Sequence, residues 1–99
     1  KLQITGATDS VCDLEPLAAR WESFGWCVRE VDGHDLDALI AVLALPPEEG
    51  RPTAVIAHTV KGKGLPYVEG QIRSHYARLG ERQHRRAMAT LRAAQKGER

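Results

Sequence analysis

Hydrophobic residues between positions 13 and 59 switch twice from helical to extended spacing. Asp13 is a residue type that caps helices, and the apolar residues after it recur three, four, seven and ten positions apart. These residues are Leu14, Leu17, Ala18, Trp21 and Phe24. Gly25 is typical of the residue that follows a helix. The pattern therefore predicts a first helix between Asp13 and Gly25.

A strand, a second helix and a second strand are predicted next. Residues 26–31 form a short extended pattern, which the polar turn at 32–35 interrupts. Asp35 can cap a second helix, whose buried stripe would consist of Leu36, Leu39, Ile40 and Leu43. Residues 53–59 are almost all apolar, which is the pattern of a central parallel strand covered on both faces.

The two ends of the chain complete the predicted order. Residues 1–5 alternate like a strand, residues 61–67 are a glycine-containing loop, and residues 81–95 favour a helix. The order β-α-β-α-β, followed by a loop and a C-terminal helix, predicts an α/β fold with part of a doubly wound, mainly parallel sheet. Because the outer strands would lack neighbours, we expect the chain to begin inside a larger fold.

Charge is distributed unevenly, although the formal net charge is only +1. Residues 1–70 carry 6 Lys and Arg against 11 Asp and Glu, whereas residues 71–99 carry 8 against 2. A basic end of this kind can face an anionic partner. We expect the helix from Glu81 to face mostly solvent or a partner subunit.

Several classes of protein are excluded by composition. No apolar run approaches the roughly 20 residues that span a bilayer, and no signal peptide is visible, so a cytoplasmic protein without membrane contact is expected. Cys12 and Cys27 are too few for a disulfide scaffold and have no ligand pattern for zinc, which favours two reduced thiols.

The candidate functional residues are the loop at 61–64 and the four histidines. The loop, Lys-Gly-Lys-Gly, follows a strand and could bring backbone amides and two lysines to a phosphate, but it matches neither a Walker A motif nor a dinucleotide fingerprint. His34, His58 and His84 are interpreted as structural or solvated. For His75 the residues alone leave a structural and a functional role open.

Five segments, taken in order, resemble the family of transketolases. The segments are Leu2-Gln3-Ile4-Thr5-Gly6, Asp13-Leu14-Glu15-Pro16-Leu17-Ala18, Phe24-Gly25-Trp26, Val31-Asp32-Gly33-His34-Asp35 and His58-Thr59-Val60-Lys61-Gly62-Lys63-Gly64. They resemble the latter half of the N-terminal, thiamine-diphosphate-binding domain, closest to the short bacterial form in which that domain is a separate subunit. The resemblance implies two domain segments: residues 1–75 as the latter half of that domain, and residues 76–99 as a basic C-terminal helical extension.

The resemblance implies a cofactor, a metal and two site residues. The cofactor is thiamine diphosphate, held through Mg²⁺ or Ca²⁺. The main-chain carbonyl of Leu2 would be a metal ligand, since hard cations take such oxygens. His75 would contact both the cofactor diphosphate and the sugar substrate. Because the basic end begins near His75, some of its charges, including Arg73 and Arg78, would border an anionic site. The family's Gly-Asp-Gly metal motif is absent from these 99 residues, so the segment alone is expected to be inactive.

The implied activity is the transfer of a two-carbon ketol unit between sugars or sugar phosphates. The expected partner is a C-terminal transketolase subunit or domain, which carries the pyrimidine-binding site and the activating glutamate, in a hetero-oligomer of dimers. Tyr76 stands where the family has a glycine, which leaves open an alternative: a decayed or specialised assembly module of the same fold. Nucleic-acid binding by the basic end is disfavoured, because no aromatic residue beyond Tyr76 lies among the arginines.

Overall fold

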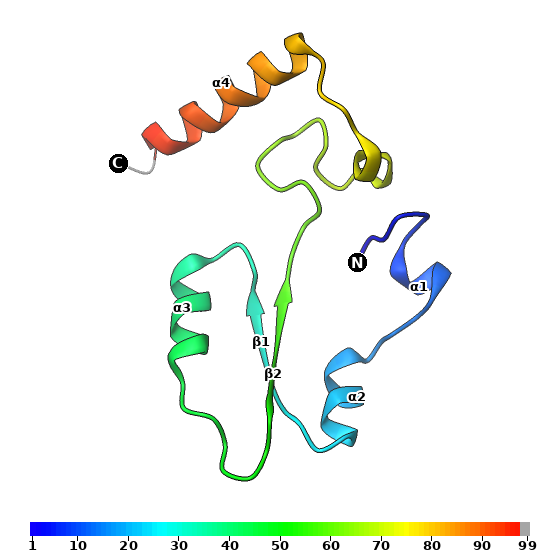
Figure 1. The fold of residues 1–99 in the computed structure, drawn as a ribbon, viewed down its shortest axis with the longest axis vertical. Coiled ribbons are helices and arrows are strands. Elements are labelled where there is room, and N and C mark those ends of the chain that lie inside the picture. Colours follow the sequence, from blue (N-terminus) through cyan, green and yellow to red (C-terminus); the bar gives the residue numbers. More distant parts are fainter. Residues whose placement is uncertain (98–99) are drawn as a thin grey trace. The chain divides into compact units, whose positions relative to one another are not determined.

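The computed structural model describes residues 1–97, which form two compact units. One unit is Thr8–Thr59, and the other combines Lys1–Ala7 with the chain from Val60 onward. The elements of each unit are labelled in Figure 1. The last two residues of the predicted extension, 98 and 99, lie outside the described residues.

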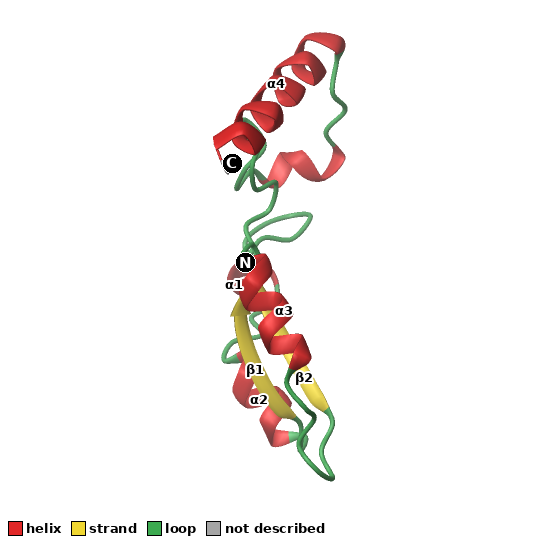
Figure 2. Cartoon of the chain, turned by 90° about the vertical axis from the view of Figure 1, so that its left-hand side faces the viewer, coloured by secondary structure: helices red, strands yellow, loops and turns green. Residues whose placement is uncertain are grey.

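A parallel pair of strands is the centre of the unit Thr8–Thr59. Strand β1 (Cys27–Asp32) pairs with β2 (Thr53–His58) in a register that places Cys27 opposite Thr53. Helix α3 (Leu36–Ala44) connects them, and α3 and α2 (Leu17–Ser23) lie on opposite sides of the strands (Figure 1, Figure 2). The predicted α/β class and the parallel pairing are confirmed, and the described residues contain this two-stranded part of the expected larger sheet.

Helix α3 has a stabilising contact at each end. Asp35 is the N-cap, and its side chain accepts a hydrogen bond from the amide of Ala38 at 2.9 Å, as the sequence predicted. Arg29 on β1 donates to the carbonyls of Leu45 at 3.1 Å and Pro46 at 2.6 Å, just after the last turn. A cation at this position also complements the negative end of the helix dipole. The strand and the helix are thereby joined by a polar contact as well as by packing.

The first predicted strand, residues 1–5, is wrong. Leu2 forms only an isolated antiparallel bridge with Ala7, and the amide of Gln3 donates to the carbonyl of Gly6 at 2.9 Å. The segment therefore folds back on itself at Gly6. A five-residue alternation specifies which side chains share a face, but a strand also needs a partner from elsewhere in the chain.

The first helix begins later than predicted. The Asp13 side chain accepts from the amide of Glu15 at 2.9 Å, which makes a turn, and Pro16 is the N-cap of α2. A short helix, α1 (Thr8–Val11), occupies part of the segment expected to be a loop.

Most apolar side chains of the described residues remain accessible. Within residues 1–97, Ala87 is the one buried hydrophobic residue, at 4% exposure. The stripe of α3 predicted to be buried is open, with Leu36 72% and Leu43 68% exposed. Strand β2 was predicted to be covered on both faces, but its first four residues are half-buried and its last two exposed. As one of two strands, β2 is an edge strand here, which explains the difference.

The second unit contains a long loop, the 3-10 helix η1 (Ile72–Tyr76) and helix α4 (Glu81–Gly97). Helix α4 confirms the predicted C-terminal helix. The Tyr67 hydroxyl donates to the carbonyl of Gln83 at 3.3 Å, and the Arg86 guanidinium lies 5.8 Å from the centre of the Tyr67 ring. These two contacts attach α4 to the loop. None of the helices in residues 1–97 is long and apolar enough to cross a membrane.

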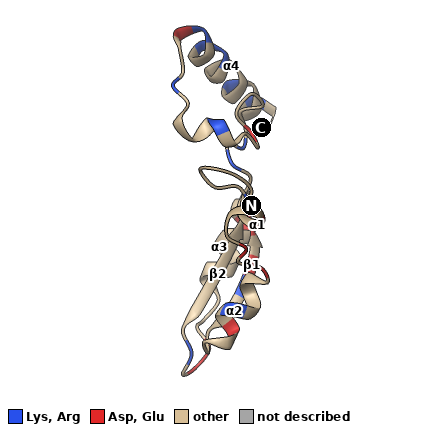
Figure 3. Cartoon of the chain, turned by 90° about the vertical axis from the view of Figure 1, so that its right-hand side faces the viewer, with Lys and Arg blue, Asp and Glu red and all other residues tan. Residues whose placement is uncertain are grey.

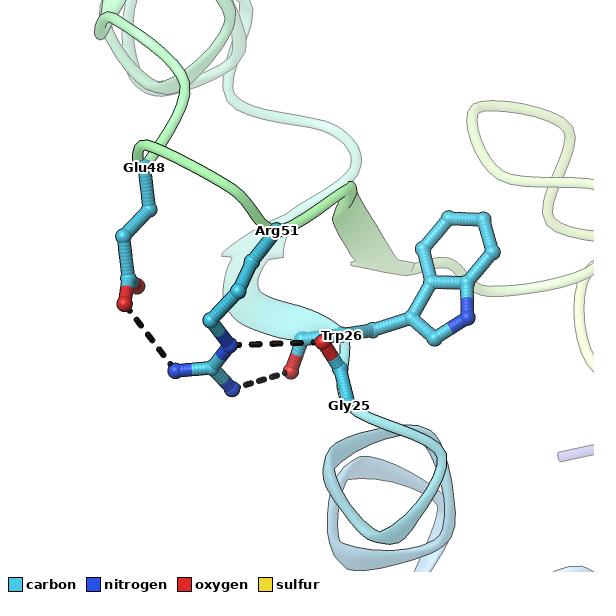
Figure 4. Close-up of polar contacts among 4 residues, drawn as sticks. All are labelled: Gly25, Trp26, Glu48 and Arg51. Atoms are coloured by element: carbon cyan, nitrogen blue, oxygen red, sulfur yellow. Dashed lines mark hydrogen bonds and ion pairs between the residues drawn. The ribbon is translucent and has the colours of Figure 1, made fainter.

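Arg51 links the turn before β2 to the chain just before β1 (Figure 4). Its guanidinium donates to the carbonyls of Gly25 at 3.3 Å and Trp26 at 2.9 Å, and it pairs with the Glu48 carboxylate at 3.0 Å. Arginine suits this position because its planar fork can donate in several directions at once.

Glu48 makes the stability of this link depend on pH. A hydrogen bond from Cys27, and then the hydrogen bond and charge of Arg51, hold the pKa of Glu48 below its ordinary value of 4.5. Such a carboxylate stabilises the fold above its ordinary pKa, and this contribution disappears as the pH falls through the lowered, folded value. We expect Glu48→Gln to reduce the urea midpoint slightly at pH 7, since the pair is exposed.

The same substitution should have a smaller effect at a second, acidic pH, because the carboxyl becomes protonated as the pH falls through the lowered pKa that Glu48 has in the folded state. Glu49→Gln is the matched control, because it neutralises the adjacent carboxylate and keeps the Glu48–Arg51 pair. Equal effects of Glu48→Gln at both pH values would contradict this account.

Candidate functional site

The glycine loop after β2 is closed by its own backbone. The amide of Gly70 donates to the carbonyl of Lys61 at 2.8 Å, and the amide of Lys63 donates to the carbonyl of Val60 at 3.1 Å. Gly62 has a φ of +73°, and a Cβ atom there would lie 2.8 Å from the carbonyl oxygen of Val68. Only glycine fits this close approach without strain. The loop is therefore a defined structure that presents its lysines from a fixed backbone.

The two loop lysines have different partners. Lys63 lies 3.6 Å from the carboxylate of Glu69, which also accepts a hydrogen bond from the amide of Gly64 at 3.1 Å. Glu69 therefore offsets the charge of Lys63. The ammonium of Lys61 instead lies 3.4 Å from Nδ1 of His75. Of the two lysines, Lys61 is the one placed beside the predicted site histidine.

His75 lies near the end of η1, between Lys61 and Tyr76. An ammonium group can only donate, so Nδ1 of a neutral His75 is the acceptor, and Nε2 then carries the hydrogen. The Tyr76 ring packs edge-on against the imidazole, with ring centres 4.8 Å apart, and is itself 77% exposed. The imidazole is thus held on two sides, and its Nε2–H is oriented as a hydrogen-bond donor.

This arrangement suits an anion better than a metal ion. Lys61 and His75 both present donor hydrogens, which match the oxygens of a phosphate or diphosphate. Within residues 1–97, no group of three or more His, Cys, Asp or Glu side chains is close enough to hold a metal ion. The donor set of the loop therefore fits the diphosphate of the predicted cofactor.

Leu2 lies in the same compact unit as the loop and His75. It is half-buried and sits at the bridge with Ala7 described above. A main-chain carbonyl is a suitable ligand for Mg²⁺ or Ca²⁺, but a single oxygen does not make a site.

The other histidines have local roles. His58 on β2 lies 2.6 Å from the carboxylate of Glu30 on β1, and its side chain is 54% exposed. The amide of His34 donates to the Asp32 carboxylate at 2.8 Å in the turn before α3, as expected for turn chemistry. His84 lies in the first turns of α4. Cys12 and Cys27 are both free thiols.

The sequence alone did not indicate which of the two loop lysines, Lys61 or Lys63, would lie beside His75. Both lysines could meet a phosphate on pattern alone, and the pairing of Lys63 with Glu69 is what separates them. Glu69 follows Lys63 by six residues and Glu30 precedes His58 by 28. Neither spacing belongs to a regular helix or strand, so neither pairing could be found without the fold.

Comparison with known proteins identifies the family. Residues 1–95 match the transketolase thiamine-diphosphate-binding domain. The chain is 39% identical over 92 residues to the 6-deoxy-6-sulfo-D-fructose transketolase subunit SqwG of Clostridium sp. strain MSTE9, covering 92% of this chain and 34% of that protein. It is 38% identical over 77 residues to an apulose-4-phosphate transketolase subunit of Phocaeicola vulgatus, covering 77% of this chain and 27% of that protein.

A transketolase of Treponema pallidum is 34% identical over 90 residues, which cover 91% of this chain and 14% of that protein. The chain thus spans only a quarter to a third of the length of the two subunit relatives, and 14% of the longer one. Because the family match covers nearly all of its residues, the chain belongs to the transketolase thiamine-diphosphate-binding domain family.

Proposed function

We propose that this chain is part of a cytoplasmic, thiamine-diphosphate-dependent transketolase that moves a two-carbon ketol unit between sugars or sugar phosphates. The observation that carries the proposal is the donor pair of Lys61, on the closed glycine loop, and His75, on η1, in a chain of this family. The relatives support the same reaction class, since they are named as transketolases or transketolase subunits.

The residues of this chain would bind and orient rather than break bonds. When bound, thiamine diphosphate supplies the electron sink for cleaving a carbon–carbon bond of a ketose. Lys61 and His75 would hold the diphosphate, and the Nε2–H of His75 would also donate to an oxygen of the sugar. The carbonyl of Leu2 would be one ligand of Mg²⁺ or Ca²⁺. Fixing donors in advance in this way lowers the entropic cost of reaching the reactive geometry.

A partner is part of the proposal. Two of the relatives described above are named as subunits, which supports a separate subunit or domain that completes the enzyme. We propose that this partner supplies the pyrimidine-binding site and the activating glutamate, in a hetero-oligomer of dimers. We also propose that residues 1–75 are the latter half of the cofactor domain and residues 76–99 its basic C-terminal helical extension.

Calorimetry on the full-length protein together with its partner tests the proposal. Titration with thiamine diphosphate in the presence of Mg²⁺ should release heat with saturation near one cofactor per site. Removing the metal with a chelator should weaken binding, since the diphosphate is held partly through the cation. The same preparation should transfer a ketol unit from a ketose to an aldose.

Absence of both heat and ketol transfer would overturn the proposal. If the chain still assembled with its partner in that case, the decayed assembly module would be the better description. Assembly without cofactor binding is therefore the outcome that separates the two alternatives.

A further inference from the structure

The ring of Tyr76 is 77% exposed and lies in the same compact unit as the loop and His75. It is the only Phe, Trp or Tyr among residues 71–99. The helix that follows it, α4, instead carries Lys and Arg side chains at intervals along its length (Figure 3). Tyr76 is therefore the one rigid aromatic surface that this basic end of the chain presents to a ligand.

Tyr67, the other tyrosine of this unit, shows how a structural tyrosine is used here. It is half-buried, its hydroxyl donates to the carbonyl of Gln83 at 3.3 Å, and the guanidinium of Arg86 lies 5.8 Å from its ring centre. Among residues 1–97, the Tyr76 hydroxyl has no hydrogen-bond partner, and the ring contact of Tyr76 is with His75. The described part of the fold thus holds Tyr76 beside His75 and uses neither its hydroxyl nor the faces of its ring.

His75 and Tyr76 stand together on a backbone that η1 fixes. The amide of Ser74 donates to the carbonyl of Gln71 at 3.0 Å, and the amide of Ala77 donates to the carbonyl of Ser74 at 3.2 Å. The centres of the two rings are 4.8 Å apart, and their planes lie at 83°. Because the Tyr76 ring meets the imidazole with its edge, a face of the ring stays open beside His75. A short carbon chain can span the distance between the Nε2–H of His75 and this face.

A sugar has both of the surfaces that this pair of side chains can bind. Its oxygens accept hydrogen bonds, which suits the Nε2–H of His75. Its C–H groups are apolar and can pack on an aromatic face, and tyrosine supplies such a contact at low entropic cost because few of its torsions must be fixed. A two-carbon aldehyde is too short to reach both groups, whereas a longer aldose can reach both. The pair is therefore suited to distinguishing aldoses by the length of their carbon chain.

We infer that Tyr76 is a specificity-determining residue, whose ring packs against the carbon chain of the acceptor aldose while His75 donates to one of the aldose oxygens. The inference rests on the proposed function, because it assigns a role within the site of that reaction. The contact is made to carbon-bound hydrogens and needs no charge on the sugar. It therefore applies equally to aldoses with and without a phosphate group.

The test is Tyr76→Ala in the full-length protein with its partner, thiamine diphosphate and Mg²⁺. We would measure kcat/KM for glycolaldehyde, erythrose and ribose as acceptors, with one ketose donor held constant. Loss of the ring should lower the ratio of kcat/KM for ribose to that for glycolaldehyde by about 10-fold, with erythrose between them. Tyr76→Phe retains the ring and should retain the ratio. Phe24→Ala is the matched control, because it removes a ring that is 83% exposed from the other compact unit and should leave the ratio unchanged.

Four outcomes would overturn the inference. An equal loss of kcat/KM for all three acceptors in Tyr76→Ala would mean that the ring acts only by positioning His75. A higher ratio in that variant would mean that the ring obstructs long aldoses instead of binding them. The same fall of the ratio in Tyr76→Phe would assign the contact to the hydroxyl, and the same fall in Phe24→Ala would show that the effect does not depend on the place of the ring.

Failure of the proposed function is recognised separately, as a natural protein that transfers no ketol unit to any of the three acceptors. The ring can then still be tested with ribitol, which has the carbon chain of ribose but no reactive aldehyde, by following the side-chain resonances of His75 and Tyr76. Shifts that saturate with ribitol but not with ethylene glycol, and that disappear from His75 in Tyr76→Ala, would support the contact. Absence of shifts would overturn it.

Discussion

Replacing His75 by alanine in the intact enzyme is expected to reduce kcat/KM for ketol transfer by about 100-fold or more. The substitution removes the Nε2–H that would donate to the substrate and the Nδ1 acceptor that lies 3.4 Å from Lys61. A positioned donor contributes this much because it is already aligned when the reaction begins. Steady-state rates with one ketose and one aldose measure the effect.

The matched control for His75→Ala is His84→Ala. Both histidines are exposed, but His84 lies in α4 and takes no part in the Lys61 contact. His84→Ala should keep full activity, and neither variant should change the free energy of unfolding by more than about 0.5 kcal/mol, because both sites are on the surface. Full activity of His75→Ala would remove His75 from the proposed machinery.

Gly62→Ala is expected to have the largest effect on the glycine loop. A φ of +73° is unfavourable for any residue with a Cβ atom, and the added atom would meet the backbone of Val68 at 2.8 Å. The dihedral strain and the clash together are expected to cost about 3 kcal/mol. Since the loop carries Lys61 toward His75, ketol transfer should fall together with the order of the loop.

Gly64→Ala provides the comparison for Gly62→Ala. Gly64 has a φ of +90°, but a Cβ atom there would meet nothing within 4 Å. Its cost should be the dihedral strain alone, about 1 kcal/mol. Exchange of the Gly70 amide hydrogen, which is bonded to the carbonyl of Lys61, measures the order of the loop directly. Equal exchange rates in the two variants would contradict the importance of the close approach to Val68.

Much of the fold could be predicted because several elements carry local signals. The Asp35 cap and the apolar spacing after it predicted α3, and the continuous apolar run predicted β2. Residues 1–5 failed because strand formation depends on a partner that periodicity does not specify. Likewise, η1 is too short to show a periodic spacing of hydrophobic residues, so the sequence pattern did not predict it.

The candidate site was less predictable than the fold, because its contacts join distant residues. His75 became a functional candidate only through family resemblance, and its role remains a prediction. The 3.4 Å approach of Lys61 to His75 spans 14 residues of the chain. The expectation that Arg73 and Arg78 border an anionic site also stays a prediction.

The contacts of Arg51 have a consequence for how this fold can vary. Arg51 lies two residues before β2, and its side chain binds the carbonyls of the two residues before β1. This contact fixes the register of the two parallel strands at the end where both begin. A slip of one residue would turn every side chain of a strand to the opposite face. Because Arg51 sets this register, residues could be inserted at Pro47, between the carbonyls held by Arg29 and the Glu48–Arg51 pair, without moving the strands. Insertions there would change the outline of the protein and preserve its sheet.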